Sequence, residues 1–335
     1  MTKQVRIGLL HKKRGNFALQ EMFAGPRKVV DTTSDEVAHH REALTEAGYA
    51  VTTIYWGPDF LRDLQASTVG LFFNVSSMAE AAILEELRLP YVGSSTPTIA
   101  LATDKSLAKR LWQEAGLPTS PFRVACGEED CADFRDQAPF SYPLFIKPVA
   151  GRGSAGIDAT SVVHNYDELV AGVSRRYNSI GQPVLIERYL QGREITIGIV
   201  GNGRNARVLP LLEIVYRTGD LALSFDKKEA DDDLFFCPAR LTDAEREEIT
   251  GLALRAYHTL GFCDFGRIDT KLTDQGAFLL EGNTFAGLTC TPAEKPHSYM
   301  GFMARAEGKG GKELLDEIVR AAIARLDAGQ REDGC

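Results

Sequence analysis

The chain has 335 residues, of which 44% are hydrophobic and 25% charged, the proportions of a globular protein with room for two or three domains. Its net charge of −8, without any block of lysine and arginine, argues against nucleic-acid binding. No stretch approaches the ~20 apolar residues of a membrane span, and the N-terminus lacks a signal-peptide pattern. We therefore expect a cytoplasmic protein that binds neither nucleic acid nor membrane.

The first part of the chain predicts a small α/β domain, residues 1–96. Thr33 followed by Glu36 forms a capping box that opens its first helix. The predicted elements are strands at 5–10, 49–55 and 69–74, a loop at 11–33, and helices at 33–47 and 78–87. Strand–helix alternation of this kind predicts a parallel sheet.

The next part predicts a smaller unit of mixed α and β structure, residues 97–189. A helix at 104–114 ends at Gly116, and Pro118 lies just beyond it, the usual order at a helix C-terminus. The remaining elements are a strand at 144–147, a glycine-rich loop at 150–156, a helix at 166–177 and a strand at 183–187.

The last part predicts a third unit, residues 190–328, followed by a tail at 329–335. Thr242 and Glu245 form a capping box that opens its longest helix. The predicted elements are strands at 194–200 and 208–215, a loop at 217–236, a helix at 242–260, a strand pair at 265–272 and 276–281, and a closing helix at 312–326. The whole chain therefore belongs to the α/β (α+β) class.

The strand pair near the C-terminus carries the clearest chemical pattern. Asp269 lies on the first strand, whereas Glu281 and Asn283 lie at the end of the second. Two carboxylates and an amide oxygen suit Mg²⁺, which completes its shell with water and phosphate oxygens. Arg267 is two residues from Asp269 and so faces the same side of the strand. These residues predict a phosphate-chemistry site, with an ordinary acidic hairpin as the alternative.

Two lysines are candidates for the positive charge that such a site needs. Lys147 ends a strand just before the glycine-rich loop, whose backbone N–H groups can approach phosphate oxygens. Because the lysine precedes the glycines, the pattern is not a Walker A motif, and most such loops are simple turns. Lys105 opens the helix at 104–114, and an exposed helix lysine is the alternative there.

Taken together, these motifs resemble those of the D-alanine–D-alanine ligases of the ATP-grasp superfamily. The matching pieces, in family order and spacing, are Lys105, Lys147 with its glycine loop, and residues 187–196, 236–239, 266–269 and 281–289. The resemblance covers the chain from about residue 91 to the closing helix. It implies an ATP-grasp fold of three domains, in which the parallel-sheet domain precedes two ATP-grasp subdomains.

The resemblance also implies a mechanism. A substrate carboxylate attacks the γ-phosphate of ATP, and the amine of a second substrate then displaces phosphate from the acyl phosphate. The implied cofactors are ATP and two Mg²⁺ ions, with Mn²⁺ as an alternative, and the implied partners are a small carboxylate, an amino acid and a second copy in a homodimer. The assigned residues are the metal ligands Asp269, Glu281 and Asn283, the oxyanion donors Arg267 and Gly287, and the ATP contacts Lys105, Lys147, Gly153, Ser154, Glu187, Arg188, Leu190 and Glu194.

The chain departs from the ligase pattern where the amino acids bind. The Glu-Val-Ser motif of the ligases is only weakly matched, by residues 34–37. Their His-Gly segment is replaced by residues 74–78. Gly153 stands where the first serine of their glycine loop is expected. The mobile loop, residues 225–230, lacks the family's tyrosines.

Lysines in these regions are further candidates. In the mobile loop we assign Lys228 to catalysis and Lys227 to substrate binding. The serine expected nine residues after Asn283 is Pro292, which has no hydroxyl and no N–H. Lys295 is the candidate replacement as a partner for a substrate carboxylate.

Intact ATP and metal motifs beside changed pockets predict retained chemistry on changed substrates. We expect a ligase that joins an amino acid to another small carboxylate in specialised, natural-product metabolism. One alternative is an authentic D-alanine–D-alanine ligase of peptidoglycan synthesis. The other is a non-catalytic ATP-binding protein.

Overall fold

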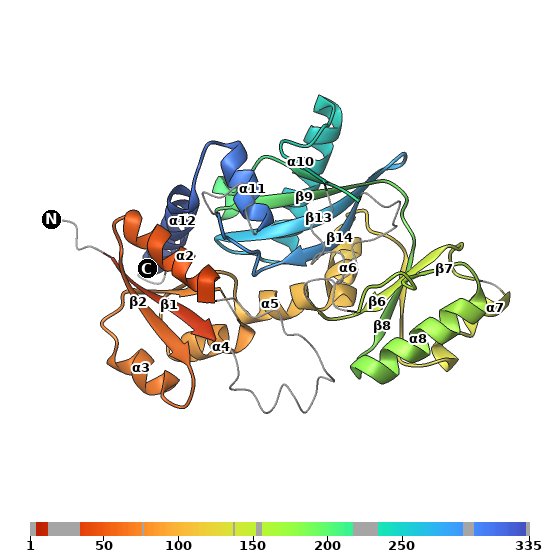
Figure 1. Cartoon of the computed structure of the whole chain (residues 1–335), viewed down its shortest axis with the longest axis horizontal. Helices are drawn as coiled ribbons and strands as arrows, with labels where there is room; N and C mark the ends of the chain where they lie inside the picture. The colour runs from red at the N-terminus through yellow and green to blue at the C-terminus, as the bar shows by residue number, and fades with distance from the viewer. Residues whose placement is uncertain are drawn as a thin grey trace.

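The chain folds around three β-sheets that follow one another along the sequence (Figure 1). The structure, a computed structural model, describes residues 5–12, 34–75, 77–136, 138–151, 156–216, 234–290 and 298–332. Across these ranges, no helix has both the length and the apolar character needed to cross a membrane.

The first sheet is parallel, with strand order β2-β1-β3-β4, as the strand–helix alternation predicts. Its central strand β1 buries Ile7, Leu9 and Leu10 completely, because helices cover both faces of a parallel sheet. The elements are β1 (Arg6–Lys12), α2 (Ser34–Glu46), β2 (Ala50–Trp56), α3 (Phe60–Ala66), β3 (Leu71–Asn74), α4 (Met78–Glu86) and β4 (Tyr91–Val92). Helix α3 was not predicted, and the capping residue Thr33 lies outside the described residues.

The second sheet is antiparallel, with order β5-β8-β6-β7, and α8 packs against it (Figure 1). Asn165 caps the start of α8 by accepting a hydrogen bond from the backbone N–H of Glu168. The helix ends at Gly181, whose φ of +68° is the left-handed conformation common there. The elements are β5 (Phe122–Ala125), β6 (Leu144–Pro148), β7 (Val162–Val163), α8 (Tyr166–Ile180) and β8 (Val184–Arg188).

The third sheet has order β12-β11-β9-β13-β14, with β10 paired to β9. The predicted strand at 208–215 is wrong as a single element, because it breaks around Pro210, which has no N–H to donate. The predicted loop at 217–236 ends in a strand, and its residues 217–233 lie outside the described ranges. The strands are β9 (Arg193–Val200), β10 (Arg207–Val208), β11 (Leu212–Val215), β12 (Leu234–Phe236), β13 (Phe265–Thr273) and β14 (Gly276–Asn283).

Helix α10 (Asp243–Thr259) packs against this third sheet. The predicted capping box at its start is confirmed. The Thr242 side chain accepts from the N–H of Glu245, and the Glu245 carboxylate accepts from the N–H of Thr242.

Two consecutive helices, α5 (Thr96–Thr103) and α6 (Lys105–Glu114), connect the first sheet to the second (Figure 1). Asp104 separates them, and its carboxylate accepts hydrogen bonds from the N–H groups of Ser106 and Leu107. Helix α6 also packs against α10 and β14 of the third sheet. Lys105 therefore opens a helix that packs against the sheet carrying the predicted metal ligands.

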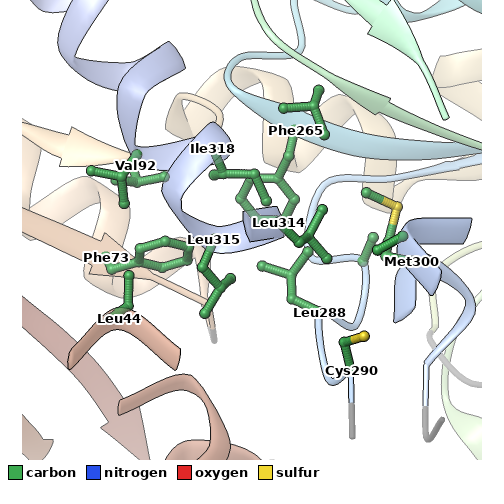
Figure 2. Close-up of a cluster of buried hydrophobic side chains, with 14 of the residues drawn as sticks. Leu44, Phe73, Val92, Phe265, Leu288, Cys290, Met300, Leu314, Leu315 and Ile318 are labelled. Atoms are coloured by element: carbon green, nitrogen blue, oxygen red, sulfur yellow. The ribbon is translucent and has the colours of Figure 1, made fainter. Parts of the chain in front are cut away.

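The closing helix α12 (Gly311–Glu332) packs on α2 and β4 of the first domain. Leu314, Leu315 and Ile318 of α12 are completely buried (Figure 2). Around them lie Leu44, Phe73 and Val92 from the first domain, and Phe265, Leu288 and Met300 from the C-terminal part of the chain. The first and third sheets thus share one hydrophobic core. The domain bounds at residues 96, 189 and 328 stay predictions.

Candidate active site

The hairpin of β13 and β14 brings the predicted metal-binding residues onto one face. In its register, Arg267 lies opposite Asn283 and Asp269 lies opposite Glu281. Cross-strand partners point to the same face of a sheet. The four side chains are therefore neighbours, as period-two alternation predicts.

A β-bulge turns Glu281 toward this face. Leu279 is completely buried, so strict alternation along β14 would bury residue 281 as well. Instead, the register shifts between Asp269 and Thr270, and Leu280 is left without a cross-strand partner. The extra residue rotates the end of the strand, which is a common arrangement at active sites.

Arg267 and Asp269 form a two-pronged ion pair. Nε of Arg267 lies 2.9 Å from Oδ1 of Asp269, and Nη2 lies 2.8 Å from Oδ2. Burial raises the pKa of Asp269 above its ordinary value, against the opposing effect of Arg267, and the charge of Glu281 raises it further. A cation between the two acids would relieve this repulsion.

The donor set of the hairpin fits Mg²⁺. Nδ2 of Asn283 lies 3.1 Å from Oδ2 of Asp269 and 3.5 Å from Oε1 of Glu281, so three oxygen-bearing side chains converge. Among the described residues, no three His, Cys, Asp or Glu side chains gather into a metal site. A metal on this hairpin would therefore have two acids and one amide, and would take its remaining ligands from water and phosphate, as Mg²⁺ commonly does.

Lys105 faces this hairpin from α6. Its Nζ lies 3.6 Å from Oε2 of Glu281 and donates a hydrogen bond of 3.1 Å to the carbonyl of Gly151, at the start of the glycine-rich loop. The residue is only 7% exposed, so the alternative of an exposed helix lysine is wrong. Lys105, Gly151, Arg267, Glu281 and Asn283 all line one cavity of about 130 Å³.

Lys147 pairs with Glu187 beside this cavity. Its Nζ lies 2.8 Å from Oε2 of Glu187, and both side chains are buried. Burial alone would lower the pKa of Lys147, but Glu187 and Glu281 raise it above its ordinary value. For the acid Glu187 burial has the opposite effect and alone would raise the pKa. The charges of Lys109 and Lys147 instead hold the pKa of Glu187 at about 2. Both partners therefore keep their charges.

Sequence reasoning missed Lys109, which lies on α6 one turn after Lys105. Its Nζ lies 2.6 Å from Oε1 of Glu187, and its side chain is completely buried. The polar pattern of α6 gives no signal that separates a buried lysine from an exposed one. The hydroxyls of Thr119 and Ser120 accept hydrogen bonds from Lys109, but the sequence does not show that these residues lie beside it.

The other predicted nucleotide contacts lie at the join between the second and third sheets. Arg188 ends β8, and Leu190 follows it with 8% exposure. Glu194 lies on β9 and pairs with Lys271 at 3.4 Å. The predicted residues that fall outside the described ranges are Gly153, Ser154, Lys227, Lys228, Pro292 and Lys295.

Comparison with known proteins decides the family. The family model described as D-ala D-ala ligase C-terminus matches residues 111–320. The D-alanine–D-alanine ligase of Bordetella avium is 35% identical over 252 residues, 75% of each chain. That of Bordetella pertussis is 33% identical over 302 residues, 87% of this chain and 90% of that protein.

The chain belongs to the D-alanine–D-alanine ligase family. A solved structure agrees in fold: the D-alanine–D-alanine ligase of Bacillus anthracis, complexed with ATP, has a TM-score of 0.70 at 18% identity and covers 97% of this chain and 99% of that chain. The predicted ATP-grasp fold is thus confirmed, and so is the prediction of a C–N bond-forming ligase. The predicted cofactors, ATP and Mg²⁺, are those of the D-alanine–D-alanine ligase family.

A serine that a count of nine residues from Asn283 does not reach lies near Gly287. Ser298 caps helix α11 (Tyr299–Ala306), and its hydroxyl donates to the carbonyl of Thr289 at 2.7 Å. It lies against Gly287, since a Cβ added to that glycine would come within 3.0 Å of the Ser298 Cβ. A serine therefore lies beside the predicted oxyanion donor of this ligase.

Proposed function

We propose that this protein is an ATP-dependent ligase that joins the carboxylate of one amino acid to the amine of a second substrate. The carboxylate oxygen attacks the γ-phosphorus, ADP leaves, and the amine then displaces phosphate from the acyl phosphate to give an amide. The observation that carries the proposal is the approach of Lys105 to Glu281 on the bulged hairpin, at 3.6 Å. In this arrangement a buried lysine, suited to bind phosphate, faces the acids Asp269 and Glu281, which are suited to bind Mg²⁺.

We assign roles to the residues that line and adjoin the cavity. Lys105 and Lys147 bind phosphate oxygens and orient the transferred group. Asp269, Glu281 and Asn283 would hold Mg²⁺, which neutralises phosphate charge when bound. The proposed donors to the tetrahedral oxyanion are Arg267 and the N–H of Gly287.

The proposed nucleotide contacts divide between backbone and side chain. The side chain of Glu187 is only 3% exposed and is held by two lysines, so we assign it to the support of Lys147. The backbone of Arg188 and Leu190, where β8 ends, is proposed for the adenine. Glu194 on β9 is proposed for the ribose.

D-alanine is the first candidate substrate. Both relatives described above are named D-alanine–D-alanine ligases, and each is at least 33% identical to this chain. Ser298 lies against Gly287, but its hydroxyl donates to the carbonyl of Thr289, so we do not assign it to the substrate carboxylate.

A different amino acid or carboxylate is the second candidate, and Asn74 favours it. This side chain stands where the ligases have their His-Gly segment, and it is 1% exposed. Its amide forms two hydrogen bonds with the backbone of Ser77, at 2.9 and 3.3 Å. A role in specialised metabolism, a homodimer and a cytoplasmic location all stay predictions.

The experiment is phosphate release from ATP and Mg²⁺ over D- and L-amino acids, singly and in pairs, with mass detection of products. Release with D-alanine alone and a D-alanyl-D-alanine mass would establish the first candidate. Turnover only with another amino acid or pair would establish the second. ATP consumption that depends on no amino acid would contradict the ligase proposal.

A further inference from the structure

Lys109 is a buried cation that does not line the ATP cavity. It lies on α6 with no exposed side-chain surface, and its Nζ contacts Oε1 of Glu187 at 2.6 Å. Its Nζ also donates to the hydroxyls of Thr119 at 2.5 Å and Ser120 at 3.1 Å. A buried ammonium has three N–H groups to satisfy, and these three partners do so.

Glu187 is shared between two lysines. One of its oxygens accepts from Lys109 and from Ser120, whose hydroxyl lies 3.1 Å away, and the other lies 2.8 Å from Lys147. A single carboxylate carries one negative charge, so it cannot neutralise both ammonium groups. The three side chains together keep one positive charge.

The surrounding ion pairs do not cancel this charge. Within the described residues, Lys105 is matched by Glu281 at 3.6 Å and Lys271 by Glu194 at 3.4 Å. The group of Lys109, Glu187 and Lys147 thus holds two ammonium groups and one carboxylate, whereas each of these neighbouring acids already has a lysine beside it. Of its two lysines, Lys147 is the one that we assign to phosphate.

Lys109 also connects the two sides of the site. The hydroxyl of Thr119, one of its partners, donates to the carbonyl of Leu279 on β14 at 2.8 Å. Leu279 adjoins the bulge that turns Glu281 toward the cavity. Glu187, in contrast, belongs to β8 of the second sheet. Through Thr119 and Glu187, the contacts of Lys109 thus connect β14 of the third sheet with β8 of the second sheet.

We propose that Lys109 is a positioning residue, which neutralises Glu187 and so leaves the charge of Lys147 available to the phosphate groups of ATP. Glu187 alone would hold Lys147 in a closed, neutral pair. With Lys109 present, Glu187 orients Lys147 without cancelling its charge. The inference rests on the proposed function, since it takes ATP as the ligand.

The first variant is Lys109→Met, which removes the cation and keeps the volume of the side chain. The site loses its excess positive charge, so we expect the Kd and KM for ATP to rise about tenfold, or about 1.4 kcal/mol. The kcat at saturating ATP should change by less than about threefold, because Lys109 touches no reacting atom. An unchanged KM in a folded Lys109→Met protein would overturn the proposal.

The second variant, Lys109→Met with Glu187→Gln, restores the net charge of the group. We expect it to bind ATP at least about threefold more tightly than Lys109→Met, because the excess positive charge returns even though the orienting carboxylate of Glu187 is lost. A purely structural role for Lys109 predicts no such recovery. If the single variant fails to fold, the double variant carries the test alone, and a Kd raised about tenfold would contradict the proposal.

Arg325→Met is the matched control. Arg325 pairs at 2.7 Å with Asp264, a completely buried carboxylate that does not line the ATP cavity. We expect this variant to lower Tm without changing the Kd for ATP. Calorimetric titration of each protein with ATP in the presence of Mg²⁺ tests the proposed function and the role of Lys109 separately. A wild type that binds no ATP contradicts the proposed function, whereas equal binding by wild type and Lys109→Met contradicts the role of Lys109.

Discussion

At the scale of single residues, the site depends on how buried charges are paired. Asp269 and Glu281 lie opposite each other, and Arg267 pairs with Asp269 while Lys105 lies 3.6 Å from Glu281. Such an arrangement is costly without cations, because buried acids repel each other in a low-dielectric surrounding. Under the proposed function, Mg²⁺ bound by the two acids would relieve this repulsion, and its charge would be matched by phosphate oxygens.

The first prediction concerns Asp269→Asn. The amide keeps the shape of the side chain but removes one of the two acids, so we expect kcat/KM to fall by at least about 100-fold while Tm holds. Asp274→Asn is the control, because Asp274 is an exposed acid in the turn of the same hairpin. Wild-type turnover by Asp269→Asn would remove this residue from the metal site.

The second prediction concerns pH and His40 on α2. The ring is 3% exposed, and within the described part of the chain neither of its nitrogens has a hydrogen-bond partner. Burial, helped by the nearby His39 and His11, lowers the pKa of His40 from 6.5 to about 4. The unfolded chain therefore binds a proton more readily than the folded protein between these pH values.

Stability should consequently fall as pH drops from 6.5 to 4, by about 3 kcal/mol from this one group. Denaturant unfolding of the wild type and of His40→Met at several pH values measures the difference, in which the other titrating groups cancel. An identical pH dependence of stability in the two proteins would contradict a lowered pKa for His40.

At the scale of elements, local patterns were predicted well and irregular ones were not. The capping box of α10 depends only on Thr242 and Glu245, so the sequence alone indicates it. The bulge at Leu280 depends on pairing with β13, which no local pattern encodes. Lys109 was missed for the same reason, since its partner Glu187 lies on β8, far away in the sequence.

The third prediction concerns this capping box. Thr242→Ala removes a side-chain acceptor from the start of α10, and we expect a loss of about 1 kcal/mol in the free energy of unfolding. Thr242→Ser keeps the hydroxyl and should cost much less. Activity should change in neither variant, because Thr242 does not line the cavity of Lys105 and Glu281. Equal stability of the alanine and serine variants would contradict the cap.

At the scale of the whole molecule, sequence order and packing divide the chain differently. The sequence predicted three consecutive domains, and three sheets do follow in that order. Yet α12, the last helix, packs against β4 and α2 of the first domain and fills a core shared with the third sheet (Figure 2). The sequence predicted a closing helix at 312–326, but a helix prediction carries no information on which sheet its apolar face covers.

The fourth prediction concerns that shared core. Leu315→Ala empties a 1%-exposed position on α12, and we expect a loss of about 2–5 kcal/mol in the free energy of unfolding. Because this core joins the first and third sheets, both should unfold in one transition. Leu61→Ala, at a position 52% exposed on α3, is the control and should change stability by less than about 0.5 kcal/mol.

The most direct test of the central claim follows oxygen during turnover. The carboxylate of the amino acid that supports activity, with D-alanine first, is labelled with ¹⁸O, and the released phosphate is analysed. An acyl phosphate intermediate predicts one labelled oxygen in each phosphate, with release by Asp269→Asn slowed at least about 100-fold. Unlabelled phosphate would mean that water, not a substrate carboxylate, attacks ATP, and would contradict the ligase mechanism.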